Sequence, residues 1–101
     1  MLMAIEKSKE CRVVNNEHLS KNIDRLRKGL EWCQAHDLHV MLPDIVGAKP
    51  TILVETSASC AQLIKDGLAA EIASRSEGGI HSRVMCVVAE ECKIIWIELG
   101  H

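Results

Sequence analysis

The sequence predicts an α+β domain, in which a long N-terminal helix and a short helix pack on a largely antiparallel sheet of four to five strands. Residues 17–36 repeat apolar side chains every three or four positions, which is the spacing of one helix face. Residues 83–89 and 92–99 are rich in β-branched side chains and flank a two-residue polar break, which is typical of a hairpin. The 101 residues fit a single domain, with residues 1–10 as a loose arm.

The predicted helix has a start signal and one narrow apolar stripe. Asn15 and Asn16 are good N-cap residues, and Glu17 follows in the first turn, where a carboxylate is favoured. Gly29 costs a helix about 1 kcal/mol relative to Ala, which indicates either close packing or simple tolerance. The stripe expected to face the core consists of Leu19, Ile23, Leu26, Leu30 and Cys33.

Two short strands are predicted next. Residues 38–42 form the first strand candidate, which should end at Pro43 because proline cannot donate to a ladder. A loop over residues 44–50 follows, and residues 51–55 form the second strand candidate. A further strand at residues 11–14 is conceivable.

A short helix is expected after the second strand. Ser59 with Gln62 resembles a capping box, and Gly67 can serve as the residue that ends the helix. Residues 68–75 are ambiguous, since alanine and glutamate favour helix whereas the stop at Gly67 favours a strand. We interpret them as a strand with Leu68, Ala70 and Ile72 on one face.

The C-terminal hairpin has two apolar faces. If Glu90-Glu91 is the turn, Ala89 faces Cys92 and Met85 faces Trp96, and successive side chains alternate between the faces. A half-buried strand would alternate apolar and polar residues, so we expect cover on both sides. The second cover is either the N-terminal segment or another copy of the protein. We therefore predict a homodimer held partly through residues 84–99, with residues 1–14 or the long helix as the competing cover.

Composition excludes several classes of function. Aromatic residues make up 2% of the chain, with neither Phe nor Tyr, so a base-stacking platform is excluded. The net charge of −2 gives no bulk argument for nucleic-acid binding. We find neither a transmembrane stretch nor a signal peptide, and five cysteines without paired spacing indicate reduced thiols. The expected location is the cytoplasm, away from any membrane.

Residues able to carry chemistry form no convincing site. Cys33, His36 and His39 come nearest to a metal site, but structural zinc needs four ligands and a fourth would have to come from far away in the chain. A thiol on an apolar face behaves as a small hydrophobe, and this applies to Cys33, Cys60, Cys86 and Cys92. We therefore expect no metal, no cofactor and no catalytic residue, and we predict that the protein is not an enzyme.

One face of the first helix is a candidate binding stripe. Lys21, Arg25, Lys28 and Trp32 align opposite the apolar stripe at about 100° per residue. Three positive charges and an indole facing solvent would suit an acidic protein or phosphates. The competing interpretation is an ordinary solvated face, neutralised by Glu17 and Asp24, with Trp32 packed under a loop.

The second half of the chain resembles a loose group of short proteins encoded by prophages and other mobile elements. The residues that carry the resemblance are Lys49-Pro50-Thr51-Ile52, Cys60 with Leu63-Ile64, Gly67, and Glu91-Cys92-Lys93-Ile94-Ile95-Trp96. The resemblance implies a small accessory protein that binds and modulates a host protein, anti-CRISPR inhibitors being one such class. It implies no catalytic residue. The alternative is a nucleic-acid-associated regulator that uses the Lys21, Arg25, Lys28 and Trp32 face.

Overall fold

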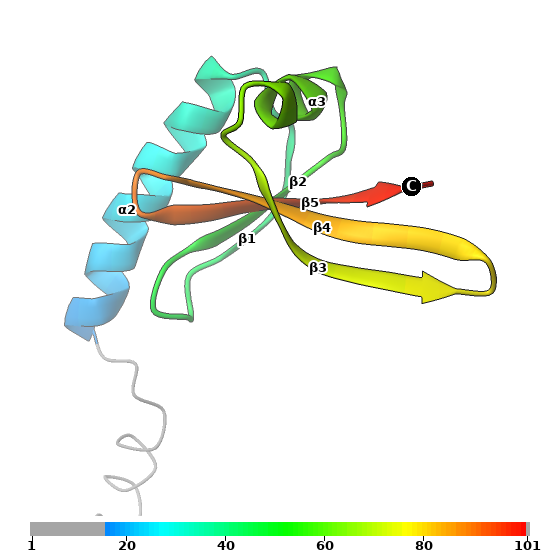
Figure 1. The fold of residues 1–101 in the computed structure, drawn as a ribbon. Coiled ribbons are helices and arrows are strands. Elements are labelled where there is room, and N and C mark those ends of the chain that lie inside the picture. The colour runs from blue at the N-terminus through cyan, green and yellow to red at the C-terminus, as the bar shows by residue number, and fades with distance from the viewer. Residues whose placement is uncertain (1–15, 101) are drawn as a thin grey trace, which may run out of the picture.

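A computed structural model describes residues 16–100 (Figure 1). The predicted arm at residues 1–10 and the conceivable strand at residues 11–14 lie outside the described residues. In chain order the elements are α2 (Asn16–Ala35), β1 (Val40–Asp44), β2 (Thr51–Val54), α3 (Ala58–Lys65), β3 (Ala70–Glu77), β4 (Ile80–Ala89) and β5 (Cys92–Leu99).

The five strands form one mixed sheet in the order β1-β2-β5-β4-β3. Only β2 and β5 are parallel among these neighbours, because the chain leaves β2, builds α3 and the β3–β4 hairpin, and then returns beside β2. Two helices on a mostly antiparallel five-stranded sheet confirm the predicted α+β class.

Both described helices pack on one face of the sheet, which we call the helix face (Figure 1). In place of Phe or Tyr, this core is built from aliphatic residues and thiols around one fully buried indole, that of Trp96. The indole Nε1 donates a hydrogen bond to Glu98 Oε2 at 3.1 Å, which satisfies its only polar group. The core comprises Cys33, Leu38, Ile52, Val54, Cys60, Leu63, Met85, Val87, Cys92, Ile94 and Trp96.

The C-terminal hairpin forms in the predicted register. Ala89 pairs with Cys92 and Met85 pairs with Trp96, so the turn is Glu90-Glu91. Both turn residues have positive φ, +52° and +59°, as a type I′ turn requires. This left-handed backbone normally favours Gly or Asn, so the pairing of the flanking strands holds the turn residues in it.

The strand prediction at residues 38–42 was wrong at both ends. β1 begins at Val40 and continues through Pro43, which pairs with Ile52. The proline is tolerated because β1 is an edge strand, with a ladder partner on one side only. Leu38, before the strand, is buried in the core.

The capping-box prediction for the second helix was also wrong. α3 starts at Ala58, and the N-cap is Ser57, whose extended backbone carries no side-chain cap hydrogen bond. Starting there turns Cys60 and Leu63 into the core, where they are buried, so packing outweighs the missing cap. The predicted stop is confirmed, with Gly67 at φ +78° directly after the C-cap Asp66.

The ambiguous segment at residues 68–75 is a strand, as we predicted, although β3 begins at Ala70. A bulge between Glu71 and Ala73 breaks the alternation. The expected shared face of Leu68, Ala70 and Ile72 therefore does not exist, because Leu68 precedes the strand and Ile72 sits at the bulge.

The face of α2 that packs on the sheet differs from the predicted stripe. Ile23 is 53% exposed, whereas its neighbour Asn22 is 0% exposed. Asn22 Nδ2 donates hydrogen bonds to the backbone oxygens of Ile45 and Gly47, both at 2.9 Å, so a polar side chain ties the helix to the β1–β2 loop. Gly29 is buried against β5, and a Cβ built there would lie 2.7 Å from Cys92 Sγ. Close packing therefore explains this glycine.

Candidate interaction surface

The groups able to carry chemistry are dispersed or buried. Among residues 16–100, no three or more His, Cys, Asp or Glu side chains lie close enough together to hold a metal ion. His36 stacks on Trp32 with ring centroids 3.8 Å apart. Burial, with smaller contributions from nearby Cys92 and Cys60, raises the pKa of the Cys33 thiol from 9.0 to about 11, which disfavours a reactive thiolate. Burial likewise raises the pKa of the Cys86 and Cys92 thiols.

The predicted binding stripe on α2 is split by the fold. Lys21 and Lys28 are exposed, as expected. Trp32 is half-buried and packs against the core, so its indole is only partly available to solvent. Arg25 is also half-buried, and its guanidinium lies 3.5 Å from Glu91 and donates a hydrogen bond to Asn22 Oδ1 at 3.2 Å.

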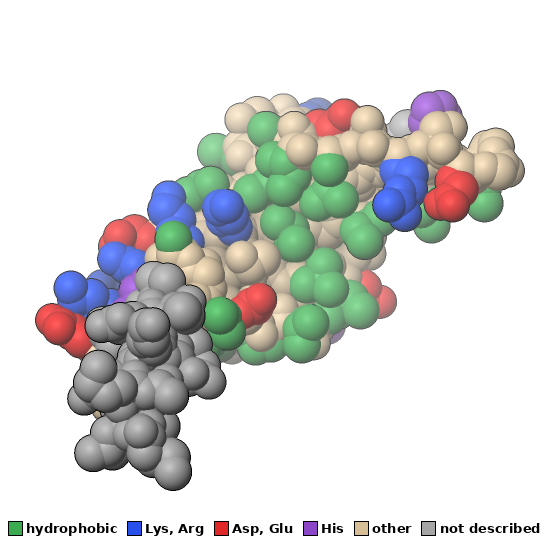
Figure 2. All heavy atoms as spheres, turned by 90° about the horizontal axis from the view of Figure 1, so that it is seen from below, with side chains coloured by type: hydrophobic (Ala, Val, Ile, Leu, Met, Phe, Trp, Pro, Cys, Tyr) green, Lys and Arg blue, Asp and Glu red, His purple; other side chains and the backbone are tan. Residues whose placement is uncertain are grey.

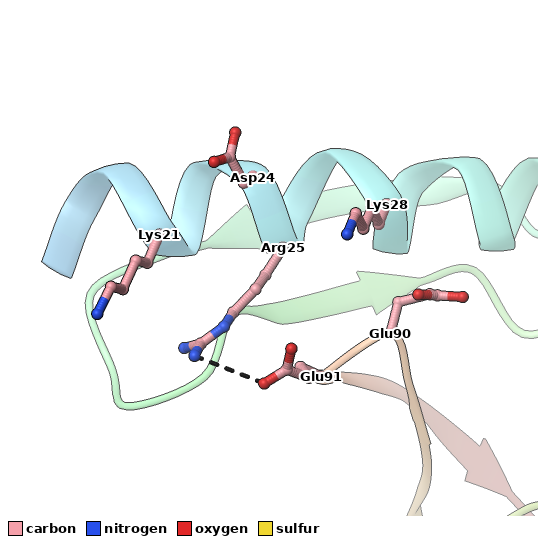
Figure 3. A pocket seen from close by; sticks show the side chains of 6 residues that line it. All are labelled: Lys21, Asp24, Arg25, Lys28, Glu90 and Glu91. Atoms are coloured by element: carbon pink, nitrogen blue, oxygen red, sulfur yellow. Dashed lines mark ion pairs between the residues drawn. The ribbon is translucent and has the colours of Figure 1, made fainter. Parts of the chain in front are cut away.

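The turn of the β4–β5 hairpin lies beside the stripe, and its Glu91 pairs with Arg25. A shallow hollow of about 220 Å³ is lined by cations of α2 and by carboxylates of both α2 and the turn (Figure 3). Nothing in the sequence brings the turn to the helix, so its carboxylates were missed as partners. The lining residues are Lys21, Asp24, Arg25, Lys28, Glu90 and Glu91.

The side of the sheet opposite the helices is a larger candidate surface, which we call the open face. Directly paired residues of neighbouring strands share a face, so the register identifies its members. Apolar side chains cover its centre (Figure 2), and several are half or more exposed, such as Ile97 at 50% and Leu99 at 68%. The apolar members are Met41, Leu42, Leu53, Ala70, Ala73, Ile80, Val84, Cys86, Val88, Ile95, Ile97 and Leu99.

The sheet reverses its polarity toward the tip of the β3–β4 hairpin. On the helix face, the network there is charged: Arg83 contacts Glu98 at 3.1 Å and Glu71 at 3.7 Å. On the open face of the same strands, Val84 pairs with Ile97 and remains apolar. The helix face therefore becomes charged where the helices no longer cover it (Figure 1), whereas the opposite side is still apolar at Val84 and Ile97. This inversion indicates that the open face is patterned for burial.

Two hollows flank Ile97 on the open face. One, of about 340 Å³, is lined by Met41 and Leu53 toward β1 and β2. The other, of about 330 Å³, lies toward β3, and its lining combines Ala73 and Val84 with the polar residues Ser74, Arg75, Ser82 and Arg83. Ile97 lines both hollows, so it forms a ridge between two depressions of similar size. The apolar character of residues 84–99 was visible in the sequence, whereas the contribution of β1 and β2 was not.

No helix among residues 16–100 is both long and apolar enough to cross a membrane. Neither the curated proteins nor the solved structures include a match to the chain. A family model described as an uncharacterised protein matches residues 7–98, which is most of the chain. The chain therefore belongs to this family of uncharacterised proteins.

Proposed function

We propose that the protein is a non-enzymatic binding module whose open face docks another protein. The apolar patterning of that face carries the proposal, because it persists where the helix face has become charged. The largest contiguous apolar patch on a soluble monomer is often an interaction site. The buried thiols and the partly paired α2 stripe offer no comparable site for catalysis.

We further propose that the docked protein is a host protein whose activity the module modulates, as an anti-defence inhibitor such as an anti-CRISPR does. The resemblance of the second half to short prophage and mobile-element proteins supports this part. An apolar surface on a small scaffold also suits this role, since it can cover a partner's surface without chemistry of its own.

The test is capture of a host protein, followed by binding measurements with the purified pair. Ile97→Asp places a carboxylate at the centre of the open face and should weaken binding at least tenfold. Ile23→Asp is the matched control, because Ile23 is 53% exposed on α2 and Ile97 is 50% exposed. Equal binding by both variants would remove the open face as the docking surface.

A nucleic-acid-associated regulator is the alternative, and the exposure of Lys21 and Lys28 on one side of α2 favours it. Phosphate contacts make affinity fall steeply with salt, so labelled duplex DNA and single-stranded RNA should be tested by anisotropy at low salt. Changing Lys21, Arg25 and Lys28 together to Ala should then reduce both the affinity and the salt dependence. Absence of binding at low salt would end this alternative. The triple variant should remain folded, since each exposed ion pair contributes about 0–1 kcal/mol.

A further inference from the structure

We propose that a second copy of the chain covers the open face in the free protein, so that two sheets pack face to face as a two-fold homodimer. The inference rests on the proposed function, because both use the open face, and it names the occupant when no other protein is bound. The proposed dimer interface extends beyond the hairpin of residues 84–99, because β1 and β2 contribute to the same surface.

The shape of the open face suits packing against itself. A two-fold interface uses the same patch on both copies, so the patch must carry both a protrusion and a depression. Ile97 is the protrusion, and the hollows of about 340 and 330 Å³ on its two sides are the depressions. If the second copy is shifted along the face by half the distance between the two hollows, its Ile97 can insert into one hollow of the first copy. The two-fold axis then places Ile97 of the first copy in the equivalent hollow of the second.

The size of the open face fits a reversible dimer. Neighbouring strands lie about 4.8 Å apart and rise about 3.3 Å per residue. Five strands, each about six residues long, therefore form a face of roughly 24 by 20 Å. The projected area of about 480 Å² reaches the upper range of patches on monomers and lies below the roughly 800 Å² per partner of a standard interface. We therefore expect a dimer that forms only at high concentration, and in which a better-fitting protein can displace the second copy.

The charges on this side of the sheet do not oppose self-association. They lie at its margins and carry both signs. Lys93 is the second residue of β5, and Asp44 ends β1. Arg75, on the edge strand β3, lines one of the hollows and lies 3.7 Å from Glu77. A patch that meets its own copy would be disfavoured by charge of a single sign. The apolar centre and mixed margin instead resemble the core and rim of a protein interface.

Sedimentation equilibrium on the full chain tests the proposal. From about 1 μM to about 1 mM, the mass should rise from 11.2 kDa toward twice that value. Ile97→Asp should associate at least about 100-fold more weakly, because the two-fold axis introduces the unpaired carboxylate twice. Ile23→Asp should associate like the unmodified chain. Should Ile97→Asp fail to fold by circular dichroism, Leu99→Asp, at the exposed end of β5, makes the same test.

The outcomes separate this inference from the proposed function. A chain that stays at 11.2 kDa at about 1 mM overturns the homodimer. If that chain still loses its host protein upon Ile97→Asp, the open face belongs to the host protein and the proposed function stands. A dimer that persists in folded Ile97→Asp and Leu99→Asp variants overturns the assignment of the interface. A dimer lost in Ile97→Asp but kept in Ile23→Asp supports the inference whether or not a host protein is captured.

Discussion

Replacing Gly29 by Ala should destabilise the protein, although the same change stabilises most helices. An added Cβ would meet Cys92 Sγ at 2.7 Å and Ile52 Cδ1 at 2.9 Å. Forcing an extra carbon into a packed core costs about 1–3 kcal/mol. The gain in helix propensity is about 1 kcal/mol. We expect a net loss of about 1 kcal/mol in the free energy of unfolding, with a fall of roughly 4–8 °C in Tm for a domain of this size.

Urea denaturation of Gly29→Ala beside Ser20→Ala measures this effect. Ser20 is exposed on the same helix, so its change reports propensity alone and should stay within about 0.5 kcal/mol. In a double-mutant cycle, Cys92→Ala removes the sulfur that opposes the new methyl group, and we expect a favourable coupling of about 1 kcal/mol. A Gly29→Ala variant that is about 1 kcal/mol more stable than the unmodified chain would refute the close approach of α2 to β5.

Three further predictions concern other parts of the fold. Asn22→Ala removes two hydrogen bonds to the β1–β2 loop and should lower the free energy of unfolding by about 1–3 kcal/mol; an unchanged urea midpoint would show that the loop does not depend on them. Leu26→Asp places a charge against the core and should abolish cooperative unfolding; a soluble variant that melts cooperatively would contradict this packing. Because the folded chain holds the Cys33 proton up to a pKa of about 11 whereas the unfolded thiol releases it near 9.0, stability should fall between these pH values. The slope is about 1.4 kcal/mol per pH unit, and Cys33→Ala should lack this part of the decline in denaturation curves measured across the range.

Short-range patterns determined much of the secondary structure. Helix spacing identified α2, and β-branched runs around two glutamates identified the β4–β5 hairpin with its register. These features depend on side-chain alternation within a few residues, which the sequence displays directly. Local signals failed where tertiary contacts outweighed them. Pro43 is accepted within β1 because that strand is at the edge, and Ser57 rather than Ser59 precedes α3 because Cys60 and Leu63 must reach the core.

The open face and the outer face of α2 differ in how much of each the sequence determines. That both faces of residues 84–99 are apolar is a property of the sequence, because alternation assigns each side chain to a face. Only the tertiary structure placed both described helices on one of those faces, since the parallel pairing of β2 with β5 joins segments about forty residues apart. The same long-range packing buried Asn22 in place of Ile23. It also brought Glu91 to Arg25 and packed Trp32 against the core, so two of the four residues of the predicted binding stripe are half-buried. Contacts between distant segments leave no periodic trace in a single sequence, so these partners could not be predicted from it, whereas the apolar character of the open face could.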